Sequence, residues 1–309
     1  MEQILRTILI VMTFVVLTGS VILLSSSLVF VKIIIYPKTR SRKQSYEDEL
    51  KTGRLDQCKI LSLNYQDVKV SSPFGYDLSG RYFANKSSNA VVLCHGINCT
   101  MFQSLKYAEL FYDMGFSVLI YDQRNHGDSG GDFTSYGYFE KYDLKACIDY
   151  LCGLNGGQGI IGVHGESMGA AVALQTLNID NRISFCIADC PFSDLEEMLA
   201  LRLHDKYGLA PFPFMNLVEF LLNLSGKFDV HKVSPIKDMF SCNTPVLFVH
   251  GTADSLIPCS MSVDMYNSVP DKTVKELFLV KDARHTESIV KDKEGYGEAV
   301  RSFLGRLPI

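Results

Sequence analysis

GVHGESMGA, residues 162–170, places a serine between glycines where an apolar run ends and a helix-like run begins. The run IIGVH (160–164) precedes the serine, and AAVALQTL (170–177) follows it. A side chain that projects from so sharp a strand-to-helix turn needs glycine around it, because the backbone is strained and the flanks leave no room. The new helix also offers free N–H groups and the positive end of its dipole to developing negative charge. We therefore predict that Ser167 is a nucleophile held above a β-sheet.

Short apolar runs alternate with amphipathic stretches on both sides of this turn. Most of the runs are apolar without interruption, which is typical of strands buried on both faces of a parallel sheet. The strand-like runs cover residues 68–70, 78–83, 90–95, 117–122, 160–164, 185–189, 245–250 and 274–280, and the helix-like stretches cover 103–114, 138–154, 168–177 and 295–304. This alternation predicts βαβ units, so we expect an α/β three-layer sandwich around a mostly parallel central sheet over residues 61–309.

One long segment before the run 245–250 breaks the alternation. It contains LRLHDKYGLAPFPFMNLVEFLLNL (201–224), and a structureless loop of that length is unusual in a compact domain. We predict a helical lid insertion at about 195–240, over the carboxyl edge of the sheet, where open α/β sheets bind ligands. Its apolar side chains are expected to form an acyl pocket or lid, or else to pack on the sheet: Phe212, Phe214, Met215, Leu217, Phe220 and Leu221.

A serine nucleophile needs a general base that is itself oriented by an acid. In this architecture, the expected chain order is serine, then aspartate or glutamate, then histidine. Asp254 follows the run PVLFVH and His285 follows VKELFLV, so both lie where strands end at one edge of the sheet. We predict that Ser167, Asp254 and His285 form a catalytic triad. Asp189 and Asp194 are alternatives for the acid.

Acyl transfer also needs donors for the oxyanion that forms during attack. We predict the backbone N–H of Met168, which follows the serine, and that of Ile97, in the loop after AVVLCH, as an oxyanion hole. Asn98 is the second choice in that loop. The cysteines and histidines do not cluster at ligand spacing, so we expect no metal and no organic cofactor.

The N-terminal segment predicts membrane attachment. Residues 7–31 carry no charged side chain, and as a helix they are long enough for the roughly 30 Å core of a bilayer. A cleaved signal peptide would have a shorter apolar run, of about 7–15 residues, and a small-residue cleavage site. We predict a transmembrane anchor with a basic flank at 1–40 and a polar tether at 41–60. Basic residues are retained in the cytoplasm, so a single-pass chain with a cytoplasmic catalytic domain is expected from the charges after the span: Lys32, Lys38, Arg40, Arg42 and Lys43.

The composition suits a globular domain and argues against some partners. A net charge of −4 over 309 residues, without a long basic stripe, argues against nucleic acid. Nine cysteines, an odd number scattered through apolar runs, do not suggest a disulfide framework. We expect buried reduced thiols in a reducing compartment.

Five motifs, in this order, resemble the α/β-hydrolase superfamily, and in particular bacterial membrane-anchored serine hydrolases grouped with serine-aminopeptidase-like and lysophospholipase-like members. The motifs are HGINCTMFQ (95–103), YDQRNHGDSGG (121–131), GVHGESMGA (162–170), HGTADSLIP (250–258) and ARHTES (283–288). Asn125 stands where the family's D-x-R-G-H-G-x-S loop has glycine, and asparagine tolerates a left-handed backbone better than most residues. The resemblance implies the fold and a Ser-His-Asp triad.

These features predict a serine hydrolase, similar to carboxylesterases and lysophospholipases, that cleaves an ester or related acyl bond of a small-molecule or lipid-like substrate through an acyl-enzyme. Two alternatives stay open. A serine aminopeptidase or amidase would need acidic side chains to hold the substrate's ammonium group, and Glu196, Glu197 and Glu219 are available in the insertion. A catalytically inactive binding scaffold at the membrane would need no triad. The sequence makes no prediction of the oligomeric state.

Overall fold

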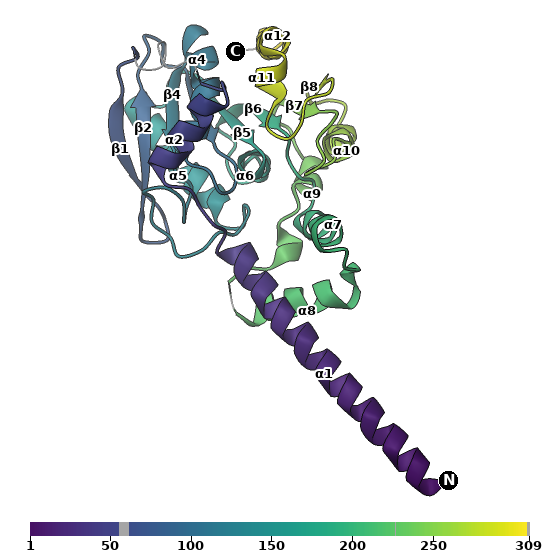
Figure 1. Cartoon of the computed structure of the whole chain (residues 1–309). Coiled ribbons are helices and arrows are strands. Elements are labelled where there is room, and N and C mark those ends of the chain that lie inside the picture. Colours follow the sequence, from purple (N-terminus) through teal and green to yellow (C-terminus); the bar gives the residue numbers. More distant parts are fainter. Residues whose placement is uncertain (56–61, 226, 308–309) are drawn as a thin grey trace.

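The computed structural model describes residues 1–55, 62–225 and 227–307. Within these ranges, the chain forms an eight-stranded sheet in the order β1-β2-β4-β3-β5-β6-β7-β8 (Figure 1). β2 runs antiparallel to β1 and β4, and the other neighbours are parallel, which confirms the predicted fold class. The strands are β1 (Gln66–Ser71), β2 (Asp77–Phe83), β3 (Ala90–Cys94), β4 (Ser117–Tyr121), β5 (Ile161–Glu166), β6 (Ile183–Asp189), β7 (Val246–Gly251) and β8 (Lys275–Val280).

Helices cover both faces of the sheet and enclose two hydrophobic cores. Val92 of β3 belongs to the core under α5, α6 and α10, whereas its neighbours Val91 and Leu93 belong to the core under α4 and α12. This division follows from the two-residue period of a strand, and it explains why the central strands are apolar without interruption. The helices are α4 (Leu105–Asp113), α5 (Glu140–Leu154), α6 (Met168–Thr176), α10 (Ser260–Ser268), α11 (Ser288–Lys291) and α12 (Lys293–Gly305), with the 3-10 helix η1 (Met101–Ser104) before α4.

The segment predicted as an insertion is helical. Asp194 begins its first helix by accepting a hydrogen bond from the N–H of Glu196 (3.0 Å), and Gly208, at φ 65°, ends that helix. Pro211 begins the next one. The elements are α7 (Leu195–Tyr207), α8 (Pro211–Leu224), the 3-10 helix η2 (Val230–Lys232) and α9 (Pro235–Met239). α8 lies across α1 (Figure 1).

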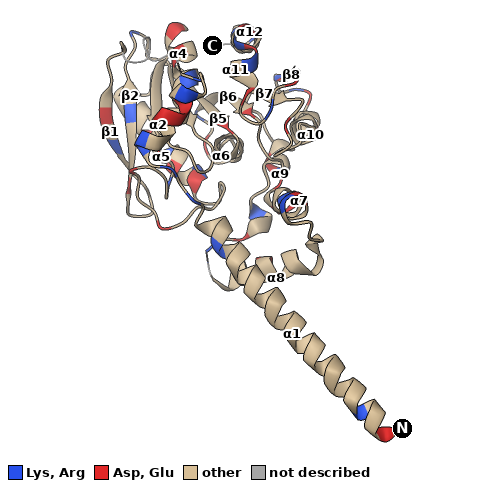
Figure 2. Ribbon diagram, in the orientation of Figure 1, with Lys and Arg blue, Asp and Glu red and all other residues tan. Residues whose placement is uncertain are grey.

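One long helix, α1 (Glu2–Ile35), precedes the domain and projects from it (Figure 1). It is the one helix in the described part of the chain that is long and apolar enough to cross a membrane. Its outer part is exposed, whereas Phe30, Val31, Ile34 and Ile35 are buried against the domain. Charged residues occur only near its two ends, and α8 has a single one (Figure 2).

Part of the predicted tether is instead a helix fixed to the domain. This helix, α2 (Arg42–Lys51), begins with a capping box. Arg42 then forms ion pairs with Asp122 (2.7 Å) and Asp128 (2.6 Å), which lie about eighty positions further along the chain. The polar composition of this segment predicted a tether because the two aspartates that hold the helix are distant from it in sequence. The stretch 56–60 of the predicted tether lies outside the described residues.

Candidate active site

Ser167 occupies the turn between β5 and α6, with φ 56° and ψ −120°. A positive φ is strained for a residue with a side chain, and such strain is common at functional sites. A Cβ at Gly165 would collide with the carbonyl of Gly169, and a Cβ at Gly169 would collide with the carbonyl of Cys94. This close packing is the physical reason for the glycine spacing in the sequence.

The structure brings the three predicted triad residues together. Asp254 follows β7 and His285 follows β8, and both strands run parallel to β5, so their ends meet at one edge. His285 Nε2 lies 2.9 Å from Ser167 Oγ, and His285 Nδ1 lies 2.6 Å from Asp254 Oδ2. Of the alternative acids, Asp189 accepts hydrogen bonds in a buried network and Asp194 caps α7.

The surroundings of Asp254 favour its ionised form. Burial alone would raise its pKa, but hydrogen bonds from His250, His285 and the N–H of Ile257 outweigh burial and hold the pKa below its usual range. Its Oδ1 atom accepts the N–H groups of Leu256 (2.8 Å) and Ile257 (2.9 Å). An ionised acid here favours the tautomer of His285 with its proton on Nδ1, which leaves Nε2 to accept the serine proton.

His250 also contacts this carboxylate, although the sequence marks it only as a residue at a strand end. Its Nε2 lies 2.9 Å from the carbonyl oxygen of Ile257 and 3.2 Å from Asp254 Oδ2, so Nε2 carries a proton and donates it. Its Nδ1 lies 2.7 Å from Ser262 Oγ. His250 therefore helps to orient the acid, and its place in HGTADSLIP is the only signal for it in the sequence.

The two predicted oxyanion donors border the cavity into which Ser167 opens. Met168 is the first residue of α6, where backbone N–H groups have no partner inside the helix. Ile97 lies in the loop after β3, beside Asn98. Asn98 has a left-handed backbone, and its N–H donates to His126 Nε2 (3.2 Å), so the second-choice donor is engaged. The oxyanion role of Ile97 and Met168 stays a prediction.

A buried polar network, which the sequence analysis missed, lies next to the serine turn. Lys106 Nζ donates to Glu166 (2.5 Å), the residue before the serine, and to the carbonyl of Thr286 (3.3 Å), the residue after the histidine. The hydroxyl of Tyr107 lies 2.8 Å from Glu166 and 2.9 Å from Asp189. Burial, followed by repulsion from Glu166, raises the pKa of Asp189 to about 6. The network therefore links the serine turn to the loop that carries the histidine.

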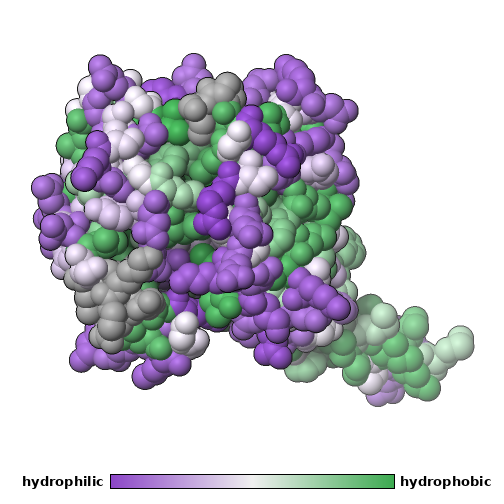
Figure 3. All heavy atoms as spheres, turned by 90° about the horizontal axis from the view of Figure 1, so that it is seen from above, coloured by the Kyte–Doolittle hydropathy of each residue, from purple (hydrophilic) through white to green (hydrophobic). Residues whose placement is uncertain are grey.

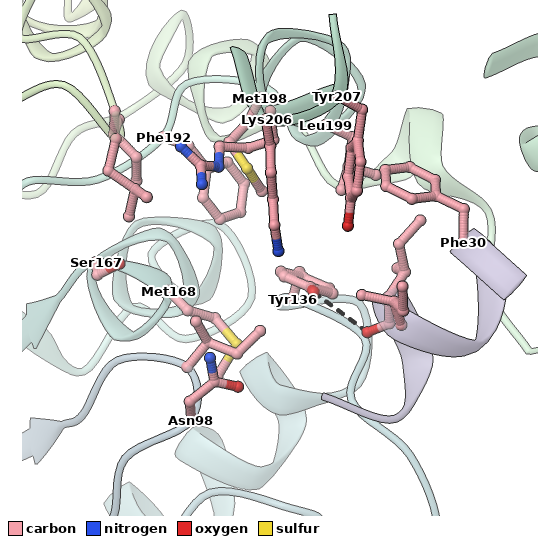
Figure 4. A pocket seen from close by; sticks show the side chains of 16 residues that line it. Phe30, Asn98, Tyr136, Ser167, Met168, Phe192, Met198, Leu199, Lys206 and Tyr207 are labelled. Atoms are coloured by element: carbon pink, nitrogen blue, oxygen red, sulfur yellow. Dashed lines mark hydrogen bonds between the residues drawn. The ribbon is translucent and has the colours of Figure 1, made fainter. Parts of the chain in front are cut away.

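Ser167 opens into a cavity of about 240 Å³, which we call the serine cavity (Figure 4). Its walls come from the loop after β3, from α7 and from the last turns of α1. They include Phe30, Ile34, Met198, Leu199, Arg202 and Lys206. The six predicted pocket residues on α8 all belong to the described part of the chain, and none of them borders this cavity.

The prediction that α8 residues line the pocket is therefore corrected for the serine cavity, although Phe214 lines a second hollow beside α1. α8 packs on α1 instead: Phe214 meets Phe30 edge to face, with 5.5 Å between ring centroids, and Met215 is buried. Phe212 is 78% exposed and Phe220 is 59% exposed, so neither ring lines an enclosed site. The other two predicted residues are partly buried: Leu217 and Leu221. Hydrophobicity alone could not tell which of the two insertion helices borders the serine.

The acidic side chains that an aminopeptidase would need form a separate cluster. His231 lies between Glu196 (2.9 Å) and Glu219 (3.5 Å). Neither they nor Glu197, all of them described residues, border the serine cavity. Two described groups of side chains lie close enough together to hold a metal ion, namely this cluster and Cys190 with Asp254 and His285.

Comparison with known proteins agrees with the fold. The family model for "Serine aminopeptidase, S33" matches residues 85–226. The uncharacterized protein YqkD of Bacillus subtilis is 34% identical over 283 residues, which cover 91% of this chain and 92% of that protein. The solved structure of the esterase Pf2001 of Pyrococcus furiosus is 28% identical, with a TM-score of 0.67, and the match covers 82% of this chain and 94% of that chain.

A further relative is the uncharacterized membrane protein YNL320W of Saccharomyces cerevisiae, which is 21% identical over 274 residues, or 88% of this chain and 87% of that protein. The sheet and these likenesses define the class of protein: a hydrolase built on a mostly parallel α/β sheet. The chain belongs to the α/β-hydrolase superfamily, as its five motifs predict.

Proposed function

We propose that this hydrolase is a serine esterase that cleaves an acyl bond through a covalent acyl-enzyme. The observation that carries the proposal is the pair of short contacts that joins Asp254 to His285 and His285 to Ser167, beside an open cavity. This is the arrangement that makes a serine hydroxyl nucleophilic at neutral pH.

The geometry suits the following sequence of steps. Ser167 Oγ attacks the ester carbonyl carbon while His285 Nε2 takes the hydroxyl proton, and ionised Asp254 stabilises the imidazolium. The N–H groups of Ile97 and Met168 stabilise the oxyanion. The intermediate then expels the alcohol, which takes the proton from His285, and the acyl group stays on Ser167. Water, deprotonated by His285, attacks the acyl-enzyme, releases the carboxylic acid and restores the serine.

The lining of the serine cavity supports an acyl substrate over a peptide amine. Phe30, Ile34 and Leu199 give it apolar walls that suit a hydrocarbon chain. The charged side chains that border it are cationic, Arg202 and Lys206, and they would repel the free ammonium group that an aminopeptidase must bind. The name of the Pyrococcus furiosus relative, an esterase, also supports an ester substrate.

We further propose that α1 is a single-pass anchor and that the catalytic domain lies on the cytoplasmic side. The length and hydropathy of the helix support the anchor. The basic residues that follow it support the orientation. The yeast relative, which is called a membrane protein, supports the attachment.

The proposed nucleophile is tested by labelling the full-length protein with a fluorophosphonate probe. Ser167→Ala should abolish labelling and lower the turnover of p-nitrophenyl esters by about 10⁴–10⁶-fold, as for other triads. Aminoacyl-amide substrates should be turned over far more slowly than the esters by the wild type. Labelling of the Ser167→Ala variant at the wild-type level, or faster cleavage of the amides, would contradict the proposal.

A further inference from the structure

A second hollow runs along α1, where α7 and the start of α8 face it. It has a volume of about 500 Å³, and we call it the α1 groove. Its lining is almost wholly apolar and includes Val21, Ser25, Ser26, Val29, Leu203 and Phe214. The two serines are the small side chains on this face, and each donates its hydroxyl back to the helix, Ser25 to the carbonyl of Val21 and Ser26 to that of Ile22. The groove therefore presents hydrocarbon to whatever occupies it.

The α1 groove borders the serine cavity. Phe30, Ile33 and Tyr207 line both of them. Phe30 and Tyr207 meet edge to face, with 6.3 Å between ring centroids, at the junction (Figure 4). The lining of an apolar path therefore extends from Ser167 to the outer surface of α1 near Val21, and the rings of Phe30 and Tyr207 stand between its two hollows.

The far end of this path lies in the part of α1 that is proposed to cross the membrane. Val21 and Ile33 are twelve residues apart, which is about 18 Å along a helix. Most of this length belongs to the uncharged run 7–31, so in a bilayer the α1 groove opens among the acyl chains of the leaflet next to the domain. Phe212, Phe220 and Leu224 of α8 are also exposed, and α8 lies across α1 (Figure 1).

The other end of the path carries positive charge. Arg202 and Lys206, one turn apart on α7, border the serine cavity, and the Lys206 side chain extends into it (Figure 4). Among the described residues, no carboxylate lies within ion-pair distance of either side chain, although many other basic residues have such a partner. An anionic head group next to the ester would neutralise these two cations.

We propose that the substrate is a single-chain membrane lipid ester with an anionic head group, and that it enters from the bilayer through the α1 groove. Its acyl chain lies along α1, its carbonyl carbon reaches Ser167, and its head group meets Arg202 and Lys206. Hydrolysis consumes one water and yields the fatty acid and the head-group alcohol. α1 is then a wall of the substrate site as well as an anchor. This inference rests on the proposed esterase function.

The test uses the full-length protein in phosphatidylcholine vesicles, with 1-oleoyl-lysophosphatidylglycerol as the membrane substrate and p-nitrophenyl butyrate as the soluble one. Ser25→Phe and Ser26→Phe fill the α1 groove at positions that are exposed. Each should lower the ratio of long-chain to short-chain kcat/KM by roughly tenfold or more, because a pocket discriminates strongly for every methylene it excludes. Ser20→Phe is the matched control, the same substitution on the opposite face of the same helix, and should leave the ratio unchanged.

Lys206→Glu tests the head group. It should lower kcat/KM for 1-oleoyl-lysophosphatidylglycerol by roughly tenfold more than for uncharged monooleoylglycerol. An unchanged ratio in both groove variants would show that the acyl chain does not lie in the α1 groove, and an equal loss with both oleoyl esters would overturn the anionic head group. In either case, Ser167-dependent turnover of the short ester would still support the esterase function. The proposed lipid substrate and the proposed esterase function can therefore be disproved independently.

Discussion

Asp189 places an ionisable group in the buried network beside the nucleophile. Burial and Glu166 raise its pKa to about 6, whereas an aspartate in an unfolded chain has a pKa of about 3.9. The folded protein therefore holds this proton more tightly, so its stability falls as pH rises from about 4 to about 6 and changes little above that range. Asp189→Asn removes this titration. The free energy of unfolding of the variant, taken relative to that of the wild type, should therefore rise by about 2–3 kcal/mol between about pH 4 and about pH 7.

Thermal unfolding of both proteins in the same detergent, at the two pH values, measures this difference. Groups outside the buried network titrate alike in both proteins and cancel, and a loss of stability that is independent of pH does not affect the comparison. A stability difference that does not change with pH would show that Asp189 is ionised as readily in the folded chain as in the unfolded one.

Gly169 is the residue whose replacement should harm the serine turn most. A Cβ at this position would meet the carbonyl groups of Cys94 and His95, which belong to the backbone and cannot give way without moving β3. Gly169→Ala should therefore abolish esterase activity and lower the yield of folded protein. Gly153→Ala is the matched control, since that glycine lies in α5 with open space around it, and it should raise stability by about 0.5–1 kcal/mol. Normal activity of Gly169→Ala would contradict the packing described for the turn.

Residues close to a motif were predictable, and residues that reach the site from elsewhere were not. The glycines, chain order and strand ends were enough to select Ser167, Asp254 and His285, which the structure places in contact. Lys106 lacks such a signal, because its role depends on a partner that the fold brings beside it. His250 stands inside a motif, but nothing in the motif shows that its ring contacts the carboxylate of Asp254. A lysine in an amphipathic helix normally faces solvent, and nothing local marks Lys106 as buried.

At the scale of elements, the strands and the four predicted core helices match their predicted positions closely, as for β3 (predicted 90–95) and α6 (predicted 168–177), whereas α10 was not predicted. Their apolar patterns are strong because both faces of the sheet are buried. The insertion was predicted as helical, but its contacts with α1 were not. The pocket was predicted on α8, the more apolar of the two insertion helices, but the long-range packing of α8 on α1 leaves α7 beside the serine.

The placement of α7 makes a prediction about acyl-chain length. Met198→Ala enlarges the serine cavity, so the preferred ester should become longer by about two carbons, since each methylene in a pocket is worth about 1–3 kcal/mol of discrimination. Phe220→Ala, on the exposed face of α8, should leave the preference unchanged. The measurement is kcat/KM for p-nitrophenyl esters from acetate to dodecanoate. A shift with Phe220→Ala but not with Met198→Ala would show that α8, and not α7, forms the pocket wall.

At the scale of the whole molecule, apolar surface is concentrated at one end. Seen from above, the face turned away from α1 is mostly hydrophilic, and α1 extends beyond it as an apolar rod (Figure 3). Most of the exposed large apolar side chains belong to α1, and others lie on the chain around α8: Leu209, Phe212, Phe220 and Leu224. A patch of this extent on a water-soluble monomer would be unusual, which favours a membrane surface at this end.

The orientation of α1 decides where the whole catalytic domain lies, because the last turns of the helix are packed into the domain at Phe30, Ile34 and Ile35. Five basic residues follow the uncharged run, whereas Arg6 and the amino terminus precede it, so the domain is expected on the cytoplasmic side. A reporter that is active only in the cytoplasm, fused after the C-terminus and expressed in bacteria, should be active in the membrane fraction. A reporter that needs export, fused at the same site, is the matched control and should be inactive. Digestion of the catalytic domain by protease added to intact spheroplasts would place it outside and overturn the predicted orientation.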